Sequence, residues 1–242
     1  MRAIKKLAYR LLGPEQYLRL VSKMFFKSYD SGRLRKNPIY YSHYYVQKLV
    51  KKGDHVIDIG ANLGYYSVIL AKLVGSDGKV IGVEPVERFR KILLENTRKY
   101  PQVEIVPYAL GDHEGEIWMG IPSSPIDHGR MQVMDQDHGQ FKALMRKPDA
   151  VFKNLSNISY IKIDIEGAEK MVFPLLMPII QKNRPIVQIE TGGETRKMIL
   201  GLMKPLGYVA YGVVVDRLVP LTELEDWRYD LVLMPEKAKM LS

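Results

Sequence analysis

Three charged side chains alternate with isoleucines in the stretch YIKIDIEGAE at residues 160–169. Successive side chains of a β-strand point to opposite faces, so Lys162, Asp164 and Glu166 are expected on one face, about 7 Å apart. A buried charge is costly unless it is paired or serves a function. The pattern therefore predicts a strand that carries the two carboxylates to a crevice, with Lys162 deeper and paired with Asp164.

Carboxylates at the end of a strand are suited to proton removal. An alcohol is a poor nucleophile until a base takes its proton, and a positioned carboxylate can act as that base. We expect Asp164 and Glu166 in this catalytic role, with Glu190 of IVQIET (186–191) at the same edge of the sheet. The alternative is an edge strand that shows its charges to water.

A glycine turn joins a strand to a helix in HVIDIGANLGYYSVILAKL, residues 55–73. Gly60 and Gly64 bracket the turn, Asp58 precedes it, and a helix N-terminus with free N–H groups follows. Glu84 ends a second strand, KVIGVEP, 24 residues beyond Gly60. An acidic residue at this position binds ribose hydroxyls in dinucleotide folds, so Glu84 is expected to bind a ribose.

The ligand of this turn is expected to carry no phosphates. The strict G-x-G-x-x-G pattern is absent, and Asp58 would repel a pyrophosphate. An adenosine that carries a cation satisfies both observations, which describes S-adenosylmethionine. The alternative is a turn whose glycines serve only packing.

The elements that position these residues follow from alternating apolar patterns. Strands are predicted near 55–59, 79–84, 103–108, 159–165, 185–190, 207–215 and 229–234, and helices near 64–75, 86–99, 167–181 and 194–205. Such alternation predicts an α/β fold with a doubly wound, mainly parallel sheet. The last two strands have no helix between them and are expected to pair antiparallel at one edge.

Two segments stand apart from this core. Residues 112–157 show little periodicity and are too long for an ordinary connection, so we expect an insertion that acts as a substrate lid. Residues 1–50 are expected to form a helical extension, and 51–242 the main domain.

The extension carries most of the net charge of +9. Residues 1–36 contain ten basic and two acidic residues, and their apolar side chains recur at helical spacing on both sides of Gly13-Pro14. Two basic amphipathic helices can pack on the domain with their basic face in water, lie on an anionic membrane surface, or bind nucleic acid. Nucleic acid is not expected, because the rest of the chain is electrically balanced.

Composition excludes several chemistries. The 242 residues include no cysteine, which rules out disulfides, thiolate metal sites and cysteine nucleophiles. No apolar run reaches the roughly 18 residues of a membrane-spanning helix, and the basic start lacks the apolar core of a signal peptide. We expect a cytoplasmic protein that can be peripheral on the inner membrane surface.

Together these motifs resemble the FkbM family of S-adenosylmethionine-dependent methyltransferases over roughly residues 54–192. The resemblance rests on VIDIGANLGYYS, VIGVEP, VEIVPYALGDHEG and, most specifically, IKIDIEGAE. It implies a class I methyltransferase (Rossmann-like) fold with a seven-stranded sheet whose last strand is antiparallel. It also implies O-methylation, often of sugar or natural-product hydroxyls.

The resemblance further implies roles for individual residues. The methionine end of S-adenosylmethionine would lie by the glycine turn, the ribose by Glu84, and the adenine by the stretch from Ala109 to Asp112. The cofactor-binding residues expected on this basis are Asp58, Gly60, Ala61, Asn62, Gly64, Ser67, Glu84, Leu110, Asp112 and Asp164. His113 is a third catalytic candidate beside Asp164 and Glu166. No metal is expected, although His128, His138 and nearby aspartates cluster in the insertion.

The sequence thus predicts an O-methyltransferase that acts on a hydroxyl of a glycan, glycolipid or secondary metabolite. The alternatives are an RNA methyltransferase that uses the basic N-terminus, and a non-catalytic membrane-surface adaptor with a vestigial cofactor fold. The tyrosines and His43 of IYYSHYYV (39–46) could cover the cofactor, stack on a sugar, or pack beside a helix. The sequence does not define the oligomeric state.

Overall fold

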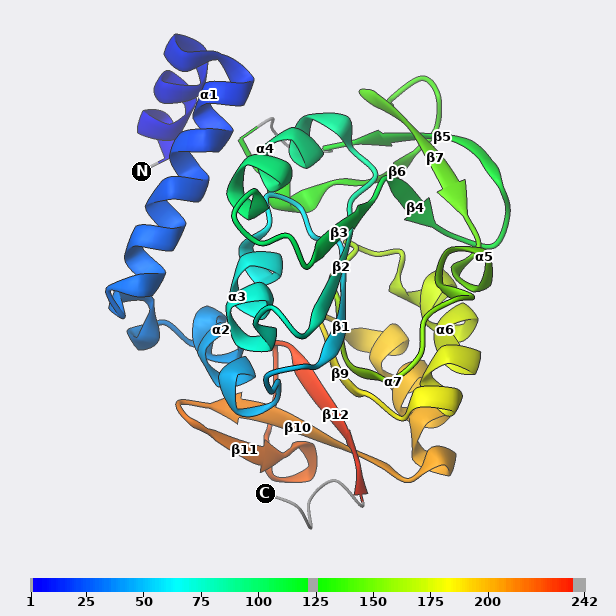
Figure 1. Cartoon of the computed structure of the whole chain (residues 1–242). Coiled ribbons are helices and arrows are strands. Elements are labelled where there is room, and N and C mark those ends of the chain that lie inside the picture. The colour runs from blue at the N-terminus through cyan, green and yellow to red at the C-terminus, as the bar shows by residue number, and fades with distance from the viewer. Residues whose placement is uncertain (1, 122–125, 237–242) are drawn as a thin grey trace.

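A twisted sheet with helices on both faces forms the centre of the computed structural model, which describes residues 2–121 and 126–236 (Figure 1). Within those residues the sheet has eight strands in the order β11-β10-β12-β9-β8-β1-β2-β3. Their bounds are β1 His55–Ile59, β2 Lys79–Val83, β3 Val103–Val106, β8 Ile158–Ile163, β9 Ile186–Ile189, β10 Tyr208–Val214, β11 Arg217–Pro220 and β12 Leu231–Pro235. All seven predicted strands are present, with small shifts at their ends.

The pairing confirms a doubly wound, mainly parallel sheet. The five strands from β3 to β9 run parallel, and β12 lies antiparallel between β9 and β10. The predicted number of seven strands was wrong by one. The apolar run at 207–215 ends in a tight turn at Val215, whose φ is 58°, and β11 returns along the outside of β10.

Helices cover the two faces of this sheet because its strands are apolar on both sides. The even-numbered side chains Val56 and Tyr160 pack with α3 (Tyr65–Val74), while Ile57 and Ile161 pack with α6 (Glu169–Asn183) and α7 (Gly193–Met203). Further helices are α2 Tyr41–Tyr45, α4 Glu87–Thr97 and α5 Pro148–Phe152. Short 3-10 helices lie at Arg33–Lys36, Pro38–Tyr40, Val46–Lys48, His128–Arg130, Lys204–Leu206 and Leu221–Glu223.

A second, smaller sheet occupies most of the region predicted as an irregular insertion. Its order is β4-β7-β5-β6, with bounds β4 Tyr108–Leu110, β5 Gly115–Gly120, β6 Gln132–Met134 and β7 Phe141–Arg146. Pro107, which has no N–H to donate, separates β3 from β4, so the strand predicted at 103–108 divides between the two sheets. Residues 112–157 therefore contain regular structure despite their weak periodicity, and their role as a substrate lid stays a prediction.

The N-terminal segment forms α1 (Arg2–Asp30), which runs along one side of the molecule (Figure 1). Gly13 has φ 74° and ψ 166°, so the helix is broken there into the two helical halves that the sequence predicts. Tyr17 and Leu18 of the second half are buried against the domain, and Arg19 pairs with Glu95 of α4 at 2.6 Å. No helix among residues 2–121 and 126–236 is long and apolar enough to cross a membrane.

Candidate active site

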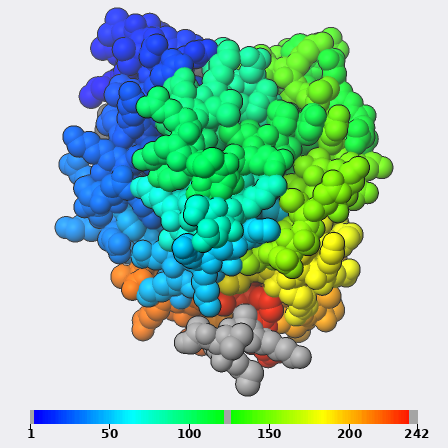
Figure 2. Space-filling view, in the orientation of Figure 1, coloured from blue at the N-terminus to red at the C-terminus, as the bar shows by residue number. Residues whose placement is uncertain are grey.

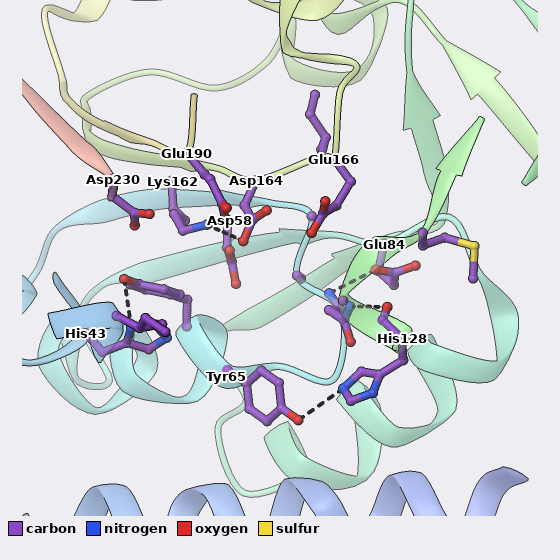
Figure 3. Close-up of a pocket in the computed structure, with 18 of the residues that line it drawn as sticks. His43, Asp58, Tyr65, Glu84, His128, Lys162, Asp164, Glu166, Glu190 and Asp230 are labelled. Atoms are coloured by element: carbon purple, nitrogen blue, oxygen red, sulfur yellow. Dashed lines mark hydrogen bonds and ion pairs between the residues drawn. The ribbon is translucent and has the colours of Figure 1, made fainter. Parts of the chain in front are cut away.

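A cavity of about 520 Å³ lies at the carboxyl ends of β1, β2, β8 and β9 (Figure 3). Charged side chains from several elements converge on it. Its lining carboxylates are Asp58, Glu84, Asp164, Glu166, Glu190 and Asp230. Lys162 and Arg228 are the lining cations in the part of the chain that the structure describes. The cavity is therefore strongly acidic.

Glu84 is held rigidly at one end of the cavity. Its side chain is 4% exposed, and its two carboxylate oxygens accept hydrogen bonds from the N–H groups of Asn62 (2.9 Å) and Val86 (2.8 Å). Burial raises the pKa of Glu84 to about 7, against the opposing effect of these N–H donors. Asn62 takes a left-handed backbone conformation (φ 49°), which turns its N–H toward Glu84.

Asn62 also carries an unsatisfied acceptor. Its side-chain nitrogen donates to the carbonyl of His128 at 3.2 Å, but its buried Oδ1 has no hydrogen-bond partner among the described residues. Buried polar atoms are nearly always paired, so an unpaired acceptor in a cavity wall is suited to a donor on a ligand.

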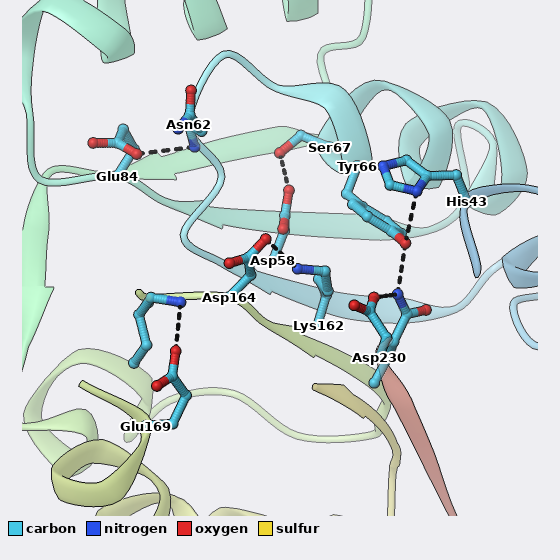
Figure 4. A network of polar contacts seen from close by, with 12 residues as sticks. His43, Asp58, Asn62, Tyr66, Ser67, Glu84, Lys162, Asp164, Glu169 and Asp230 are labelled. Carbon is cyan, nitrogen blue, oxygen red and sulfur yellow. Dashed lines mark hydrogen bonds and ion pairs between the residues drawn. The ribbon is translucent and has the colours of Figure 1, made fainter. Parts of the chain in front are cut away.

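Lys162 lies at the centre of the carboxylate cluster (Figure 4). Its ammonium group is 3.0 Å from Asp164, as the sequence predicts, and the residue is 2% exposed. Burial alone would lower the pKa of Lys162, but Asp164, Asp230 and Asp58 outweigh burial and hold this pKa above its usual value. The lysine therefore stays charged and compensates part of the negative charge around it.

Asp58 lies beneath the same cluster. Its side chain is 1% exposed and accepts a hydrogen bond of 2.6 Å from the Ser67 hydroxyl at the start of α3. Burial raises the pKa of Asp58 to about 6, although Lys162 acts in the opposite direction.

Two further carboxylates titrate near neutral pH. Burial, followed by repulsion from Asp164, raises the pKa of Glu166 to about 7 and that of Glu190 to about 8. The sequence predicts that strand alternation continues to Glu166. In the structure β8 ends at Ile163, and Glu166 has φ 48°, so Glu166 lies in a turn after the strand. The turn nevertheless brings Asp164 and Glu166 to the same cavity.

Buried aromatic and imidazole groups form the opposite wall. The His43 Nδ1 lies 3.3 Å from the Tyr66 hydroxyl, which accepts a hydrogen bond of 2.5 Å from the Gln188 side chain. Gln188 also donates to Asp230 at 2.6 Å. Burial lowers the pKa of His43 to about 3, so its imidazole is neutral. From the segment IYYSHYYV, Ile39 and His43 line the cavity, where they could cover the cofactor.

The structure brings most of the predicted site residues to the cavity. Those that line it are Asp58, Gly60, Ala61, Asn62, Glu84, Asp164 and Glu166. Ser67 acts one step behind, through its hydrogen bond to Asp58. At both glycines of the turn, neighbouring protein atoms occupy the space that a Cβ would need. A Cβ on Gly60 would lie 1.8 Å from the Asp164 carbonyl oxygen, and one on Gly64 would lie 2.7 Å from Leu93.

Besides Gly64 and Ser67, three predicted residues are absent from the cavity lining. His113 and Asp112 form a pair at 2.7 Å with side chains 62% and 61% exposed, outside the cavity lining, so the structure does not support the catalytic role predicted for His113. The reason is the turn between β4 and β5, which carries both residues to the surface of the second sheet. Leu110 is buried in the main core and is also absent from the lining.

Sequence reasoning missed lining residues that arrive from distant segments. Arg228, Tyr229 and Asp230 precede β12. Met119 comes from β5 of the second sheet, and Met131 lies just before β6. The sequence gives one weak signal for Asp230: it is an acidic residue just before a buried strand, in YDLVLMP. Asp164 was easier to predict because it follows its strand, at the edge where ligands bind.

His128 lines the cavity instead of a metal site. Its Nε2 lies 3.4 Å from the Tyr65 hydroxyl, while His138 pairs with Asp135 at 2.7 Å on the surface. Burial lowers the pKa of His128 to about 4. Among the residues with described positions, no three His, Asp or Glu side chains form a group that could hold a metal ion.

Comparison with known proteins identifies the family of the chain. Residues 58–210 match the family model described as the methyltransferase FkbM domain, which is more than half of the chain. The chain belongs to the FkbM methyltransferase family. The methyl donor of this FkbM methyltransferase family is S-adenosylmethionine, in agreement with the sequence-based expectation.

Solved structures confirm the class I methyltransferase fold. An FkbM methyltransferase from Methylobacillus flagellatus KT is 16% identical, with a TM-score of 0.53 over 93% of this FkbM chain and 58% of that one. A putative rRNA-methylase from Clostridium thermocellum is 14% identical, with a TM-score of 0.52 over 81% and 94% of the two chains.

Curated relatives match over shorter stretches. Ribosomal RNA large subunit methyltransferase E from Methanothermobacter thermautotrophicus is 31% identical over 127 residues, 50% of this FkbM chain and 54% of that enzyme. The chain spans between 10% and 54% of the length of four curated relatives that it matches.

The residues of the cavity fit S-adenosylmethionine. The unpaired Asn62 Oδ1 offers an acceptor to an ammonium or hydroxyl donor, and Glu84 offers carboxylate oxygens at the end of the second strand. The surrounding carboxylates suit a ligand that carries positive charge and no phosphate.

Proposed function

We propose that this FkbM chain transfers the methyl group of S-adenosylmethionine to a hydroxyl of a glycan, glycolipid or secondary metabolite. One observation carries the proposal: carboxylates that titrate near neutral pH lie in the cavity beside the groups that suit the cofactor. A base with a pKa near the working pH is the most effective at taking a proton from an alcohol.

The cofactor would be held by the glycine-turn side of the cavity. Glu84 would accept hydrogen bonds from the ribose hydroxyls, and Asn62 Oδ1 would accept from the amino group. Asp58, fixed by Ser67, and Asp164, fixed by Lys162, would face the positive charge. When bound, the cofactor supplies a methyl group on a positively charged sulfur.

The protein's own contribution to chemistry is positioning and proton removal. As the acceptor oxygen bonds to the methyl carbon and the carbon–sulfur bond breaks, the hydroxyl proton passes to a carboxylate. Glu166 is suited to receive it, because its pKa of about 7 keeps part of the population ionised near neutrality. Asp164 would orient the acceptor or act as the base itself. Alignment of donor and acceptor supplies several kcal/mol of the barrier reduction.

A second acceptor class is RNA, which the likeness to the ribosomal RNA enzyme over half of the chain supports. The charge of the cavity argues against it. A phosphodiester would meet six carboxylates and two cations among the described lining residues, and repulsion would weaken its binding. A neutral polyhydroxy acceptor meets no such penalty.

The test is a methyl-transfer screen of the purified chain. S-adenosylmethionine labelled at the methyl group would be incubated with glycan, glycolipid, metabolite and ribosomal RNA panels, after its binding is established by calorimetry. We expect label in a hydroxyl of a non-nucleic-acid acceptor, and turnover roughly 10²-fold lower in Glu166→Gln.

Glu194→Gln is the matched control, because Glu194 is an exposed acid on α7 outside the cavity. Its turnover should equal that of the wild type. Methylation of RNA alone, or unchanged turnover in Glu166→Gln, would contradict the proposal. If S-adenosylmethionine did not bind at all, the adaptor alternative would stand instead.

A further inference from the structure

The first half of α1 presents an apolar stripe to solvent. Its large aliphatic side chains are strongly exposed: Ile4 72%, Leu7 57%, Leu11 76% and Leu12 44%. Among the described residues, α1 holds six of the eleven strongly exposed large apolar side chains, because Leu20 and Met24 of its second half are also exposed. Isolated exposed apolar residues are ordinary, but a contiguous set on one helix indicates an interaction surface.

All charged side chains in this half of α1 are basic. Lys5, Lys6 and Arg10 are exposed, and the sequence from residue 2 to residue 12 contains no acidic residue. At 100° per residue, Ile4, Leu7 and Leu11 share one stripe, and Lys6 and Arg10 lie on the flank beside Leu7. A helix of eleven residues is about 16 Å long, too short to span a bilayer and long enough to lie along one.

The stripe is exposed while its neighbours Ala8 and Tyr9 hold this half of α1 against the domain. Tyr9 packs edge-to-face on Tyr17 with ring centroids 5.4 Å apart, and Ala8 and Tyr9 pack on the core cluster formed with the second sheet. Figure 2 shows the start of the chain as an outer corner of the molecule. The apolar side chains of the stripe therefore remain exposed and available to a partner.

We propose that the stripe formed by Ile4, Leu7, Leu11 and Leu12 (the N-terminal stripe) binds an anionic lipid bilayer. Aliphatic side chains gain free energy by entering the acyl-chain boundary, while the flanking lysines and arginine meet anionic headgroups. RNA fits less well, since it is bound by aromatic stacking and cations and not by aliphatic side chains. A second copy of the chain would bring the same cationic flank against itself.

The second half of α1 packs against a wall of the cavity. Phe25 in the second half of α1 lies 4.3 Å from Tyr65 between ring centroids, and Tyr65 lines the cavity. Figure 3 shows α1 passing beside Tyr65 and His128. Binding of α1 to a bilayer would favour an acceptor that is itself lipid-borne, such as a glycolipid hydroxyl. This part of the inference rests on the proposed function.

The test is co-sedimentation of the full chain with vesicles of phosphatidylcholine, with and without phosphatidylserine. We expect binding to the anionic vesicles that weakens as salt rises. Leu7→Gln with Leu11→Gln should weaken it roughly a hundredfold, about tenfold for each aliphatic side chain. Lys6→Gln with Arg10→Gln should weaken it roughly 25-fold at low salt.

Leu94→Gln is the matched control, because Leu94 is 55% exposed on α4 and is not part of the N-terminal stripe. The vesicle binding of this variant should equal that of the wild type. Circular dichroism would verify that each variant keeps its helix content. Equal sedimentation with and without phosphatidylserine, or no loss in the stripe variants, would overturn the proposal. So would a dimer or an RNA complex that the Leu7 and Leu11 changes abolish. Vesicle binding needs no methyl transfer, so its failure is distinct from a failure of the proposed function.

Discussion

If Glu84 binds the cofactor as a carboxylate, as proposed, cofactor affinity should rise with pH between 5.5 and 7.0. Its pKa of about 7 makes it about 3% ionised at pH 5.5 and about half ionised at pH 7.0. If only the ionised form binds the ribose, the apparent affinity for S-adenosylmethionine increases about 16-fold over this range. Asp58, with a pKa of about 6, adds up to about fourfold.

Calorimetry at both pH values, in buffers of different ionisation enthalpy, measures the affinity and the protons released. The amino group of the cofactor has a pKa near 8 and stays charged over this range, so the slope reports on the protein. Glu84→Gln keeps the shape of the side chain and removes its titration. In this variant we expect the slope to fall to about fourfold or less.

A wild-type affinity that does not change with pH, or a full slope in Glu84→Gln, would refute the role of Glu84. Because Glu84 accepts two backbone hydrogen bonds, its replacement also costs about 1–3 kcal/mol of folding free energy. Urea unfolding of the variant separates this effect from binding, since the slope is measured on folded protein.

Three further predictions follow from the same geometry. Without cofactor, the free energy of unfolding should fall between pH 5.5 and pH 8, by about 2 kcal/mol from Glu84 alone. The folded state holds a proton that the unfolded state releases near pH 4.5, so this stability is lost as pH rises through 7; urea melts that show a rise instead would contradict it. Gly60→Ala should reduce the unfolding free energy by roughly 3 kcal/mol or more, since the new Cβ would overlap the Asp164 carbonyl and φ is 85°. Gly201→Ala, in open space on α7, should be neutral or gain about 1 kcal/mol; equal losses in the two variants would reject the steric argument. Asp164→Asn should lower turnover about 100-fold and cofactor affinity less than tenfold, as measured by labelled transfer and calorimetry; the reverse order would place Asp164 in cofactor binding alone.

The main sheet could be predicted from the sequence because its strands are buried on both faces. Such strands appear as short apolar runs, and glycine and proline residues mark their ends. Asp58, Glu84 and Asp164 were predictable for a related reason: each lies at or just beyond the carboxyl end of such a run, where parallel strands deliver their side chains to one edge.

The second sheet left no comparable signal. GEIWMG and FKALMR are half-exposed strands with charged residues on one side, and they pair across a separation of about 25 residues. Local periodicity does not encode such a pairing, so the region was predicted as irregular. For the same reason the sequence did not show that His113 lies outside the cavity lining, and it did not show that Met119 and Met131 line the cavity.

The orientation of α1 also could not be predicted, because the apolar periodicity of an amphipathic helix does not say which face meets the domain. The usual arrangement buries the apolar stripe. In α1 the first half instead anchors through Ala8 and Tyr9, and Leu7 and Leu11 remain exposed. Only the packing with the second sheet distinguishes the two orientations.

The strand order has a consequence for the assembly of the protein during synthesis. β1 lies at the centre of the sheet between β2 and β8, and His55 is paired with Ile158, about 100 residues later in the chain. Asp230 arrives later still, just before β12. Pairing of such distant segments slows folding, because a long loop must close before the contact forms. Pairs such as β1 with β2 and β5 with β7 lie within about 30 residues of each other and can form early, while the cavity is completed only after Asp230 and β12 have left the ribosome. A nascent chain that ends before β12 would therefore expose apolar sheet edges and lack a complete cofactor site.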